Sequence, residues 1–360
     1  MTLRVGFLGA GFISVIHRWL LEHSGVDHEV VAVHDPDIVK AERLAAATAA
    51  AVVGEDELVA RSDAVFVCTW TSEHARLVDL AAAAGRAVFC EKPLAVDAAG
   101  AAAMIQAVER RSVVNQVGLI LRHLPGYMLA RHLLADDRAG PVMTVNLSDD
   151  QFIPVQGRYA STWRADPARA GRGALLEHSI HDVDILRWLF GPVTAVSAAS
   201  REFHGLARID DATVVRLDFA SGALGSLTTV WHEMLERPNM RRLEVLCERL
   251  HLVVEGDSEA RVRWRFAGEE ANEVTGIELA DAACACGGEA AGPLVPFGRG
   301  HAFNPLTQFL AAATAGGDGR ASPAPSPLPF AEALPAHRLV DAMYASADAG
   351  GGLMQVGVDA

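Results

Sequence analysis

The chain has 360 residues, and its 51% share of hydrophobic residues supplies enough apolar material for two domains with separate cores. Its 45 acidic residues outnumber the 31 basic ones and give a formal charge of -14, which argues against nucleic acid and anionic membrane surfaces as partners. The five cysteines fit neither a disulfide framework nor a spaced zinc site, so we expect a reduced, cytoplasmic protein without a bound metal.

The N-terminal part of the sequence begins directly with an apolar strand pattern. No cationic leader precedes it, and no apolar run reaches the roughly 18 residues that a membrane helix needs. We therefore expect neither export nor insertion into a membrane.

Short apolar runs alternate with helical stretches rich in Ala and Leu over the first third of the chain. The predicted strands are 3–8, 29–34, 64–68, 87–90 and the last strand-like run 113–121, and the predicted helices include 39–51 and 73–84. Strands and helices that alternate at this spacing predict a doubly wound parallel sheet of the Rossmann type. We assign this first domain to residues 1–122.

The pattern changes in residues 123–360, where strands follow one another. Helices are predicted at 126–135 and 174–190, and strands at 142–147, 213–219, 224–231, 242–247 and 261–266. These strands predict a largely antiparallel sheet in a second, α+β domain. The segments 269–296 and 316–329, in which Gly is frequent beside Ala and acids or beside Pro and Ser, are predicted to be surface loops or edges outside the core.

A glycine-rich turn follows the first predicted strand. Gly9 and Gly11 precede a helix that begins near Phe12, and glycines at these points let backbone N–H groups approach a pyrophosphate. Asp35 follows the second strand, where an acid binds ribose hydroxyls and repels a 2′-phosphate. The pattern predicts NAD as the cofactor in preference to NADP. The alternative is a glycine-rich turn in some other α/β protein.

The tripeptide Glu91, Lys92 and Pro93 ends the predicted strand 87–90. Ligands bind at the carboxyl ends of the strands in an open parallel sheet, so Lys92 is placed for acid/base chemistry beside a nicotinamide. The alternative is a surface lysine without a chemical role.

A second cluster of ionisable residues lies in the predicted helix 174–190. Glu177, His181 and Asp184 stand at i, i+4 and i+7 and share one face, while apolar residues cover most of the others. Ionisable groups on a buried helix have to be paired or have to line a cleft. The pattern indicates a chemical site, with a structural hydrogen-bond network or a metal site that includes His178 as the alternatives.

The sequence resembles the family of glucose-fructose oxidoreductase, inositol dehydrogenase and rhizopine-catabolism proteins (Gfo/Idh/MocA). The motifs that carry the resemblance are the Gly9 turn, Asp35-Pro36, the stretch 63–74 (DAVFVCTWTSEH), Glu91-Lys92-Pro93, residues 116–122, and Trp163-Arg164 leading into 171–191. Departures from the family pattern are Trp70, Ile120, Arg172, Glu177 in place of Asp, and the additional His178.

The resemblance implies roles for individual residues. Lys92 matches the catalytic lysine, His181 the histidine that exchanges the hydroxyl proton, and Glu177 the acid one turn before it. The residues implied for the cofactor are Gly9, Gly11, Phe12, Ile13, Asp35, Thr69, Ser72, His74, Glu91, Lys92, Gln116, Trp163 and Arg164. The residues expected near the substrate are Lys92, Arg122, His178, His181, Asp184 and His232.

The resemblance also implies an activity. We expect an NAD(P)-dependent oxidoreductase that transfers hydride between a nicotinamide and a secondary alcohol or ketone of a sugar or inositol-like polyol, as a homodimer or homotetramer. The alternatives are a redox-neutral, NAD-dependent glycoside hydrolase and a non-catalytic NAD-binding regulator on the same fold.

Overall fold

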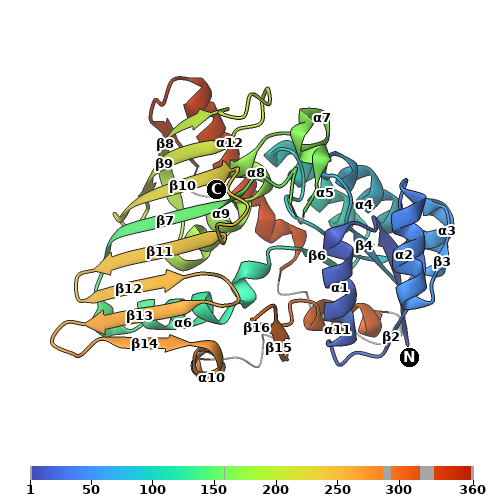
Figure 1. Cartoon of the computed structure of the whole chain (residues 1–360), viewed down its shortest axis with the longest axis horizontal. Coiled ribbons are helices and arrows are strands. Elements are labelled where there is room, and N and C mark those ends of the chain that lie inside the picture. The colour runs from blue at the N-terminus through green and yellow to red at the C-terminus, as the bar shows by residue number, and fades with distance from the viewer. Residues whose placement is uncertain (1, 158, 287–292, 317–327, 358–360) are drawn as a thin grey trace. The chain divides into compact units, whose positions relative to one another are not determined.

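The computed structural model describes residues 2–157, 159–286, 293–316 and 328–357, and its contacts divide the chain into two compact units (Figure 1). Unit 1 comprises Met1–Leu119, Ala291–Pro293 and Asn304–Leu334, and unit 2 comprises Ile120–Ala290, Leu294–Phe303 and Pro335–Ala360. The predicted second domain is one continuous segment, whereas the chain returns to unit 1 at Asn304. The side-chain amide of Asn304 donates to the carbonyl of Leu20 at 2.7 Å and holds this return in place.

Unit 1 is built on a six-stranded sheet in the order β3-β2-β1-β4-β5-β6, in which every pair is parallel. Its strands are β1 (Leu3–Leu8), β2 (His28–His34), β3 (Ala51–Val52), β4 (Ala64–Val67), β5 (Ala87–Cys90) and β6 (Asn115–Val117). Its helices are α1 (Phe12–Glu22), α2 (Ile38–Thr48), α3 (Glu55–Arg61), η1 (Thr71–Glu73), α4 (His74–Ala83), α5 (Ala98–Arg110), α11 (Thr307–Gly316) and η6 (Phe330–Ala333). The predicted doubly wound sheet is confirmed, and β3 and α3 are elements that the pattern did not predict.

Aromatic packing fills the centre of unit 1. The rings of Phe66 and Phe89, on the neighbouring strands β4 and β5, stack with centroids 5.0 Å apart, and Phe7 of β1 lies 5.1 Å from Phe66. Phe309 of α11 meets both Phe66 and Phe89 edge-on at 5.9 Å. A helix from the C-terminal third of the chain therefore completes the core of the first sheet.

Unit 2 is built on a nine-stranded sheet in the order β14-β13-β12-β11-β7-β10-β9-β8-β17. Its strands are β7 (Val142–Phe152), β8 (Val193–Arg201), β9 (Ala212–Phe219), β10 (Leu224–His232), β11 (Met240–Cys247), β12 (Leu250–Glu255), β13 (Arg261–Phe266), β14 (Asn272–Thr275) and β17 (Met354–Gln355), with β15 (Leu294–Phe297) and β16 (Gly300–Phe303) as a separate hairpin. β7 and β10 are parallel, and the other pairs of the large sheet are antiparallel. The predicted α+β architecture is confirmed.

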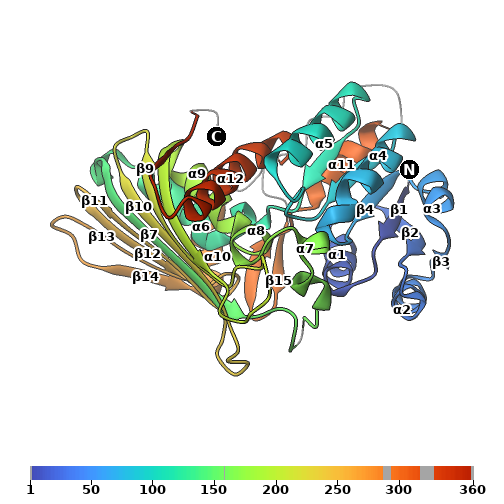
Figure 2. The same cartoon turned by 90° about the horizontal axis from the view of Figure 1, so that it is seen from above.

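Helices cover one face of this large sheet. The helical segments of unit 2 are η2 (Ile120–His123), α6 (Pro125–Leu134), η3 (Asp137–Ala139), η4 (Thr162–Ala165), α7 (Pro167–Ala170), α8 (Ala174–Glu177), α9 (Ile180–Phe190), α10 (Gly276–Ala285) and α12 (Leu334–Asp348). Figure 2 shows α6, α9 and α12 on the same side of the sheet. We call the side that these helices cover the inner face and the other side the outer face.

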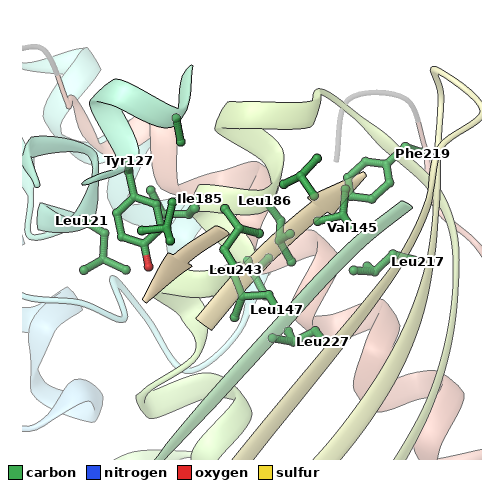
Figure 3. Packing of buried hydrophobic residues seen from close by; sticks show 14 of the residues in the cluster. Leu121, Tyr127, Val145, Leu147, Ile185, Leu186, Leu217, Phe219, Leu227 and Leu243 are labelled. Carbon is green, nitrogen blue, oxygen red and sulfur yellow. The ribbon is translucent and has the colours of Figure 1, made fainter. Parts of the chain in front are cut away.

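A row of apolar side chains crosses the inner face. Leu243, Leu147 and Leu227 are register neighbours on β11, β7 and β10, and all three are buried. Ile185 and Leu186 of α9 pack against the same cluster (Figure 3). Each fully buried Leu or Ile contributes about 1.5–3 kcal/mol, so this row fixes α9 on the sheet.

Some predicted boundaries are wrong. The segment 269–296 contains the edge strand β14, in agreement with the predicted edge, but also the helix α10, in which burial of Leu279, Ala280 and Ala283 outweighs the Gly- and Ala-rich composition. β7 continues five residues beyond the predicted 142–147, and only Asn115–Val117 of the run 113–121 is a strand. The predicted loop 316–329 lies mostly outside the described residues.

Within the described part of the chain, no helix has both the length and the apolar character needed to cross a bilayer.

Candidate functional site

The turn at Gly9 is shaped by the strand beside it. Gly9 has a φ of +96°, and a Cβ at this position would lie 2.4 Å from the carbonyl oxygen of Cys68, so the turn requires glycine. Ser14, in the first turn of helix α1, is buried. Its hydroxyl donates to the Gly9 carbonyl at 2.8 Å and so links the helix to the glycine-rich turn.

The N-terminus of α1 has the features of an anion site. A Cβ built at Gly11 meets nothing within 4 Å, so the space before the helix is open. No side chain caps the helix, and its first turn, which includes Phe12 and Ile13, contains no acid. The backbone N–H groups of this turn carry the positive end of the helix dipole. These residues therefore fit the pyrophosphate of a dinucleotide.

Asp35 is held against this turn. Its Oδ2 accepts from the backbone N–H of Ala10 at 2.7 Å, and its Oδ1 accepts from the backbone N–H of Asp37 at 2.8 Å. Each carboxylate oxygen keeps a further lone pair, which can accept a ribose hydroxyl. Asp35 lies beside the turn, as the sequence predicts, and it is held there by backbone donors.

Lys92 follows β5 and is tied to the neighbouring Glu91. The buried Glu91 carboxylate accepts from the backbone N–H of Lys92 at 3.1 Å and contacts Nε2 of His17 at 2.6 Å. Burial acts to raise the pKa of Glu91, but the contact with His17 and the charge of Lys92 leave that pKa below its usual value. Glu91 therefore anchors the Lys92 backbone to α1. The sequence pattern did not predict a role for His17, although its position three residues after the buried Ser14 marks the buried side of α1.

The other residues predicted to face the cofactor in unit 1 make contacts within the protein. His74 is buried, with Nδ1 3.0 Å from the Pro93 carbonyl and Nε2 3.4 Å from the Thr69 carbonyl, so it joins the segment after β4 to the one after β5. Gln116 is buried and donates to the Pro305 carbonyl at 2.7 Å. Ser72 is exposed in η1. Their contacts with a dinucleotide stay a prediction.

In unit 2, the structure brings Trp163, Arg164 and Glu177 together. Arg164 Nε donates to the buried Glu177 carboxylate at 3.0 Å, and its guanidinium lies 4.4 Å from the centre of the Trp163 ring. The acid that the resemblance places one turn before the catalytic histidine is therefore paired with an arginine. The guanidinium compensates the charge of Glu177 in its buried position.

The predicted continuous helix 174–190 is wrong, because it is interrupted between Glu177 and Ile180. Asp210 stabilises the first piece, α8, by accepting from the backbone N–H groups of Gly173 at 2.9 Å and Leu175 at 3.0 Å. A Cβ at Gly173 would lie 1.9 Å from the Asp210 carbonyl, so glycine is required there. Glu177 ends α8 and His181 belongs to α9, and the two do not share the face of one helix.

Arg122 and Asp184, both expected near the substrate, bind each other. Arg122 Nε donates to Asp184 Oδ2 at 2.9 Å and Nη2 donates to Oδ1 at 2.5 Å, which makes the pair bidentate. The side chain of Asp184 is 1% exposed. This buried ion pair joins η2 to α9, and contact of either residue with a substrate stays a prediction.

His178 belongs to a charge network on the inner face. Its Nε2 lies 2.6 Å from Oδ2 of Asp149 on β7. Arg241 of β11 donates to Asp149 at 2.8 Å, to Asp182 of α9 at 2.5 Å and to Asp257 at 2.6 Å. Burial raises the pKa of Asp182 from 3.8 to about 7, although the charge of Arg241 opposes the shift. The sequence analysis did not single out Asp149, Asp182 or Arg241, but a charged residue at the position of Asp149, in step with Val145 and Leu147, is a signal that strand alternation offers.

His232 does not join the other candidates. It follows the buried Trp231 at the end of β10, so it points to the outer face, where its Nε2 lies 3.4 Å from Asp150. Its Nδ1 accepts from the backbone N–H of Met234 at 3.1 Å. It therefore lies on the opposite face of the sheet from His178, and its contact with a substrate stays a prediction. No group of three or more His, Cys, Asp or Glu side chains suited to a metal ion occurs within the described ranges.

The two units match the two domain models of one family. The model described as "Oxidoreductase family, NAD-binding Rossmann fold" matches residues 3–119, and the Gfo/Idh/MocA C-terminal domain model matches residues 127–253. The chain is 35% identical over 233 residues to inositol 2-dehydrogenase of Acidiphilium cryptum, an alignment that covers 62% of this chain and spans 65% of that protein.

Solved structures share the whole fold. Levoglucosan dehydrogenase in complex with NADH and levoglucosan has a TM-score of 0.81 at 21% identity, covering 99% of this chain and 100% of that one. The WlbA dehydrogenase of Bordetella pertussis in complex with NADH and UDP-GlcNAcA has a TM-score of 0.80 at 22% identity, covering 99% and 98%. With both domain models matched in order along one chain, the protein belongs to the Gfo/Idh/MocA family of NAD-binding oxidoreductases.

Proposed function

We propose that the protein is an NAD-dependent dehydrogenase that acts on a secondary alcohol of a cyclic polyol or sugar. The observation that carries the proposal is the arrangement in unit 1: the open N-terminus of α1 and the pinned Asp35 form a dinucleotide cradle, and Lys92 follows β5 of the same parallel sheet. The carboxyl ends of parallel strands meet at one edge of the sheet, so Lys92 lies at the cofactor edge. The inositol 2-dehydrogenase relative supports the substrate class.

In the proposed reaction, His181 accepts the proton of the substrate hydroxyl while the hydrogen on the same carbon leaves as hydride. Bound NAD⁺ supplies the hydride acceptor. The Lys92 ammonium donates a hydrogen bond to the substrate oxygen and stabilises the negative charge that develops on it. Glu177, paired with Arg164, holds the start of the segment that carries His181.

The experiment is a panel of inositols, aldoses and deoxysugars with NAD and with NADP, in which formation of the reduced cofactor is followed by absorbance. Net reduction of NAD that depends on a polyol or sugar supports a dehydrogenase. Glycoside cleavage without net reduction of NAD assigns the protein to the redox-neutral hydrolases instead. Tight NAD binding without any turnover across the panel contradicts the proposed activity.

We also propose a cytoplasmic homodimer or homotetramer that forms through the outer face of the unit 2 sheet. Four large apolar side chains on that face are exposed: Val214, Leu224, Met240 and Leu246. Leu224 and Leu246 flank Thr144 in the register, and exposed apolar side chains on a sheet are commonly covered by a second copy. The five free cysteines support a reducing compartment. Sedimentation that gives a monomer at micromolar concentration contradicts the oligomer.

A further inference from the structure

The inner face of the unit 2 sheet carries a polar row beside its apolar row. Arg241, Asp149, Thr229 and Thr213 are register neighbours on β11, β7, β10 and β9. All four are buried, with Asp149 3% exposed and Arg241 4% exposed. Along β11, β7 and β10 the row lies two residues from the leucines that pack on α9. The sheet therefore changes from an apolar to a charged surface within one pleat repeat.

The segment from His178, just after α8, to Asp182, in the first turn of α9, is attached to this row at two points. His178 contacts Asp149 at 2.6 Å, and Asp182 contacts Arg241 at 2.5 Å. Arg241 also binds Asp149 at 2.8 Å, so one guanidinium links both attachment points. These five residues, from His178 to Asp182, include His181. Two sheet residues, Asp149 and Arg241, therefore hold the two ends of the segment that contains it.

The contact between His178 and Asp149 fixes how the imidazole is oriented. The same oxygen, Oδ2 of Asp149, accepts from Arg241 Nη2, which can only donate. An ionised Asp149 can only accept, so Nε2 of His178 is the donor in a hydrogen bond with this carboxylate. Nη2 of Arg241 lies farther from His178 Nε2, at 3.5 Å, so the carboxylate is the closer partner.

Accessibility separates the members of this group. The side chain of His178 is 18% exposed, whereas those of Asp149, Arg241 and Asp182 are 2%, 4% and 0% exposed. Of these four, His178 is thus the one that a small molecule can reach. An imidazole held by a carboxylate is suited to binding a hydroxyl, because a hydroxyl both donates and accepts hydrogen bonds.

We propose that Asp149 and Arg241 are positioning residues that hold His178 as a second substrate-contacting imidazole, which binds a hydroxyl of the cyclic polyol. The inference rests on the proposed function and extends it from His181 to a neighbouring hydroxyl of the same substrate. It assigns specificity to His178, the residue added to the family pattern, and to two residues on β7 and β11 that do not touch the substrate.

The test uses Asp149→Asn, His178→Gln and the double variant, with Asp150→Asn as the matched control. Asp150 is the next residue of β7, but it faces outward and pairs with Arg237. We expect His178→Gln and Asp149→Asn to raise KM for the polyol about tenfold, the factor for one lost hydrogen bond, with kcat changed far less and the Kd of NAD unchanged. Asp150→Asn keeps the KM of the original protein.

The double variant separates positioning from a structural role. If Asp149 acts through His178, the double variant has the same KM as His178→Gln alone, because the second change removes nothing further. Multiplied KM effects, or variants that change only the melting temperature, overturn the inference. If Asp149→Asn does not fold, His178→Gln alone still tests whether His178 contacts the substrate. An original protein that oxidises no polyol overturns the proposed function itself, whereas an active one with unchanged KM in His178→Gln overturns the inference alone.

Discussion

The two units place their polar candidate residues differently. In unit 1 the strands β4 and β5 are apolar and buried throughout, and Thr69 and Lys92 come after the strands have ended. In unit 2 the charged residues Asp149 and Arg241 lie within strands, beneath α9. Unit 1 forms its candidate site from backbone groups and the Asp35 carboxylate at the edge of an apolar sheet, with Glu91 and His17 as one buried pair, whereas unit 2 supports its own with a network of buried charges.

This difference predicts that mutations in the two units affect different properties of the protein. Removing a side chain at the edge of unit 1 leaves the apolar sheet intact, so binding or turnover changes more than the free energy of unfolding. Removing a member of the network in unit 2 leaves a buried charge without its partner, which costs stability as well. The following variants test this contrast, beginning with the largest expected effect.

Arg241→Met is expected to lower the free energy of unfolding by about 3–5 kcal/mol, because it leaves the buried Asp149 and Asp182 without their shared cation. Arg237→Met is the matched control, since Arg237 also pairs with an aspartate of β7 but is 47% exposed. It should have a small effect. Urea unfolding followed by circular dichroism measures both. Equal, small losses in the two variants would contradict the contrast between the units.

Lys92→Met and His181→Ala are each expected to lower kcat by about a hundredfold or more, the usual scale for a lost charge-stabilising donor and for a lost general base. Their effects on stability should differ: Lys92 stands at the edge of unit 1, whereas His181 is 8% exposed in α9. Only His181→Ala should also lower the melting temperature. The measurements are kcat, the Kd of NAD and thermal unfolding. Near-normal turnover in folded His181→Ala protein rules out the proposed proton acceptor.

The same contrast determines what could be predicted from the sequence. Gly9, Asp35 and Lys92 act through their place after a strand, and that place can be recognised from a short local pattern. The network of Asp149 and Arg241 depends on the register of two strands 92 residues apart, which no local pattern contains. The contact of the Leu175 N–H with Asp210 likewise joins residues 35 positions apart, whereas the orientation of His232 follows from strand alternation at the end of β10. The fold follows from periodicity, and the charge pairs follow from register.

Asp182 should give the protein a pH-dependent stability. Its pKa is about 7 in the folded protein and 3.8 ordinarily, so between these values the folded state binds a proton that the unfolded state has released. This contribution to stability is present in full below pH 3.8 and is lost as the pH rises through about 7, by up to about 1.4 kcal/mol per pH unit. Urea unfolding at pH 5, 6 and 7 should show a smaller decline in Asp182→Asn than in the original protein. Parallel curves would contradict the assignment, and Asp257→Asn, at the exposed end of Arg241, is the control.

Asp35→Ser tests the cradle of unit 1, where the expected effect is on affinity alone. The carboxylate repels a 2′-phosphate, so the original protein should bind NAD more tightly than NADP, and the serine variant should narrow the ratio of the two dissociation constants by about tenfold. The affinity for NAD should also fall, because Asp35 holds the Ala10 N–H that shapes the turn. Asp37→Ser is the control, since Asp37 caps α2 and should leave the ratio unchanged. Titration of both dinucleotides into the purified protein measures the four constants. Tighter binding of NADP by the original protein would place the carboxylate away from the ribose. A large loss of thermal stability in Asp35→Ser would contradict the contrast between the units, because the edge of unit 1 would then depend on one side chain as much as the charged row of unit 2 does.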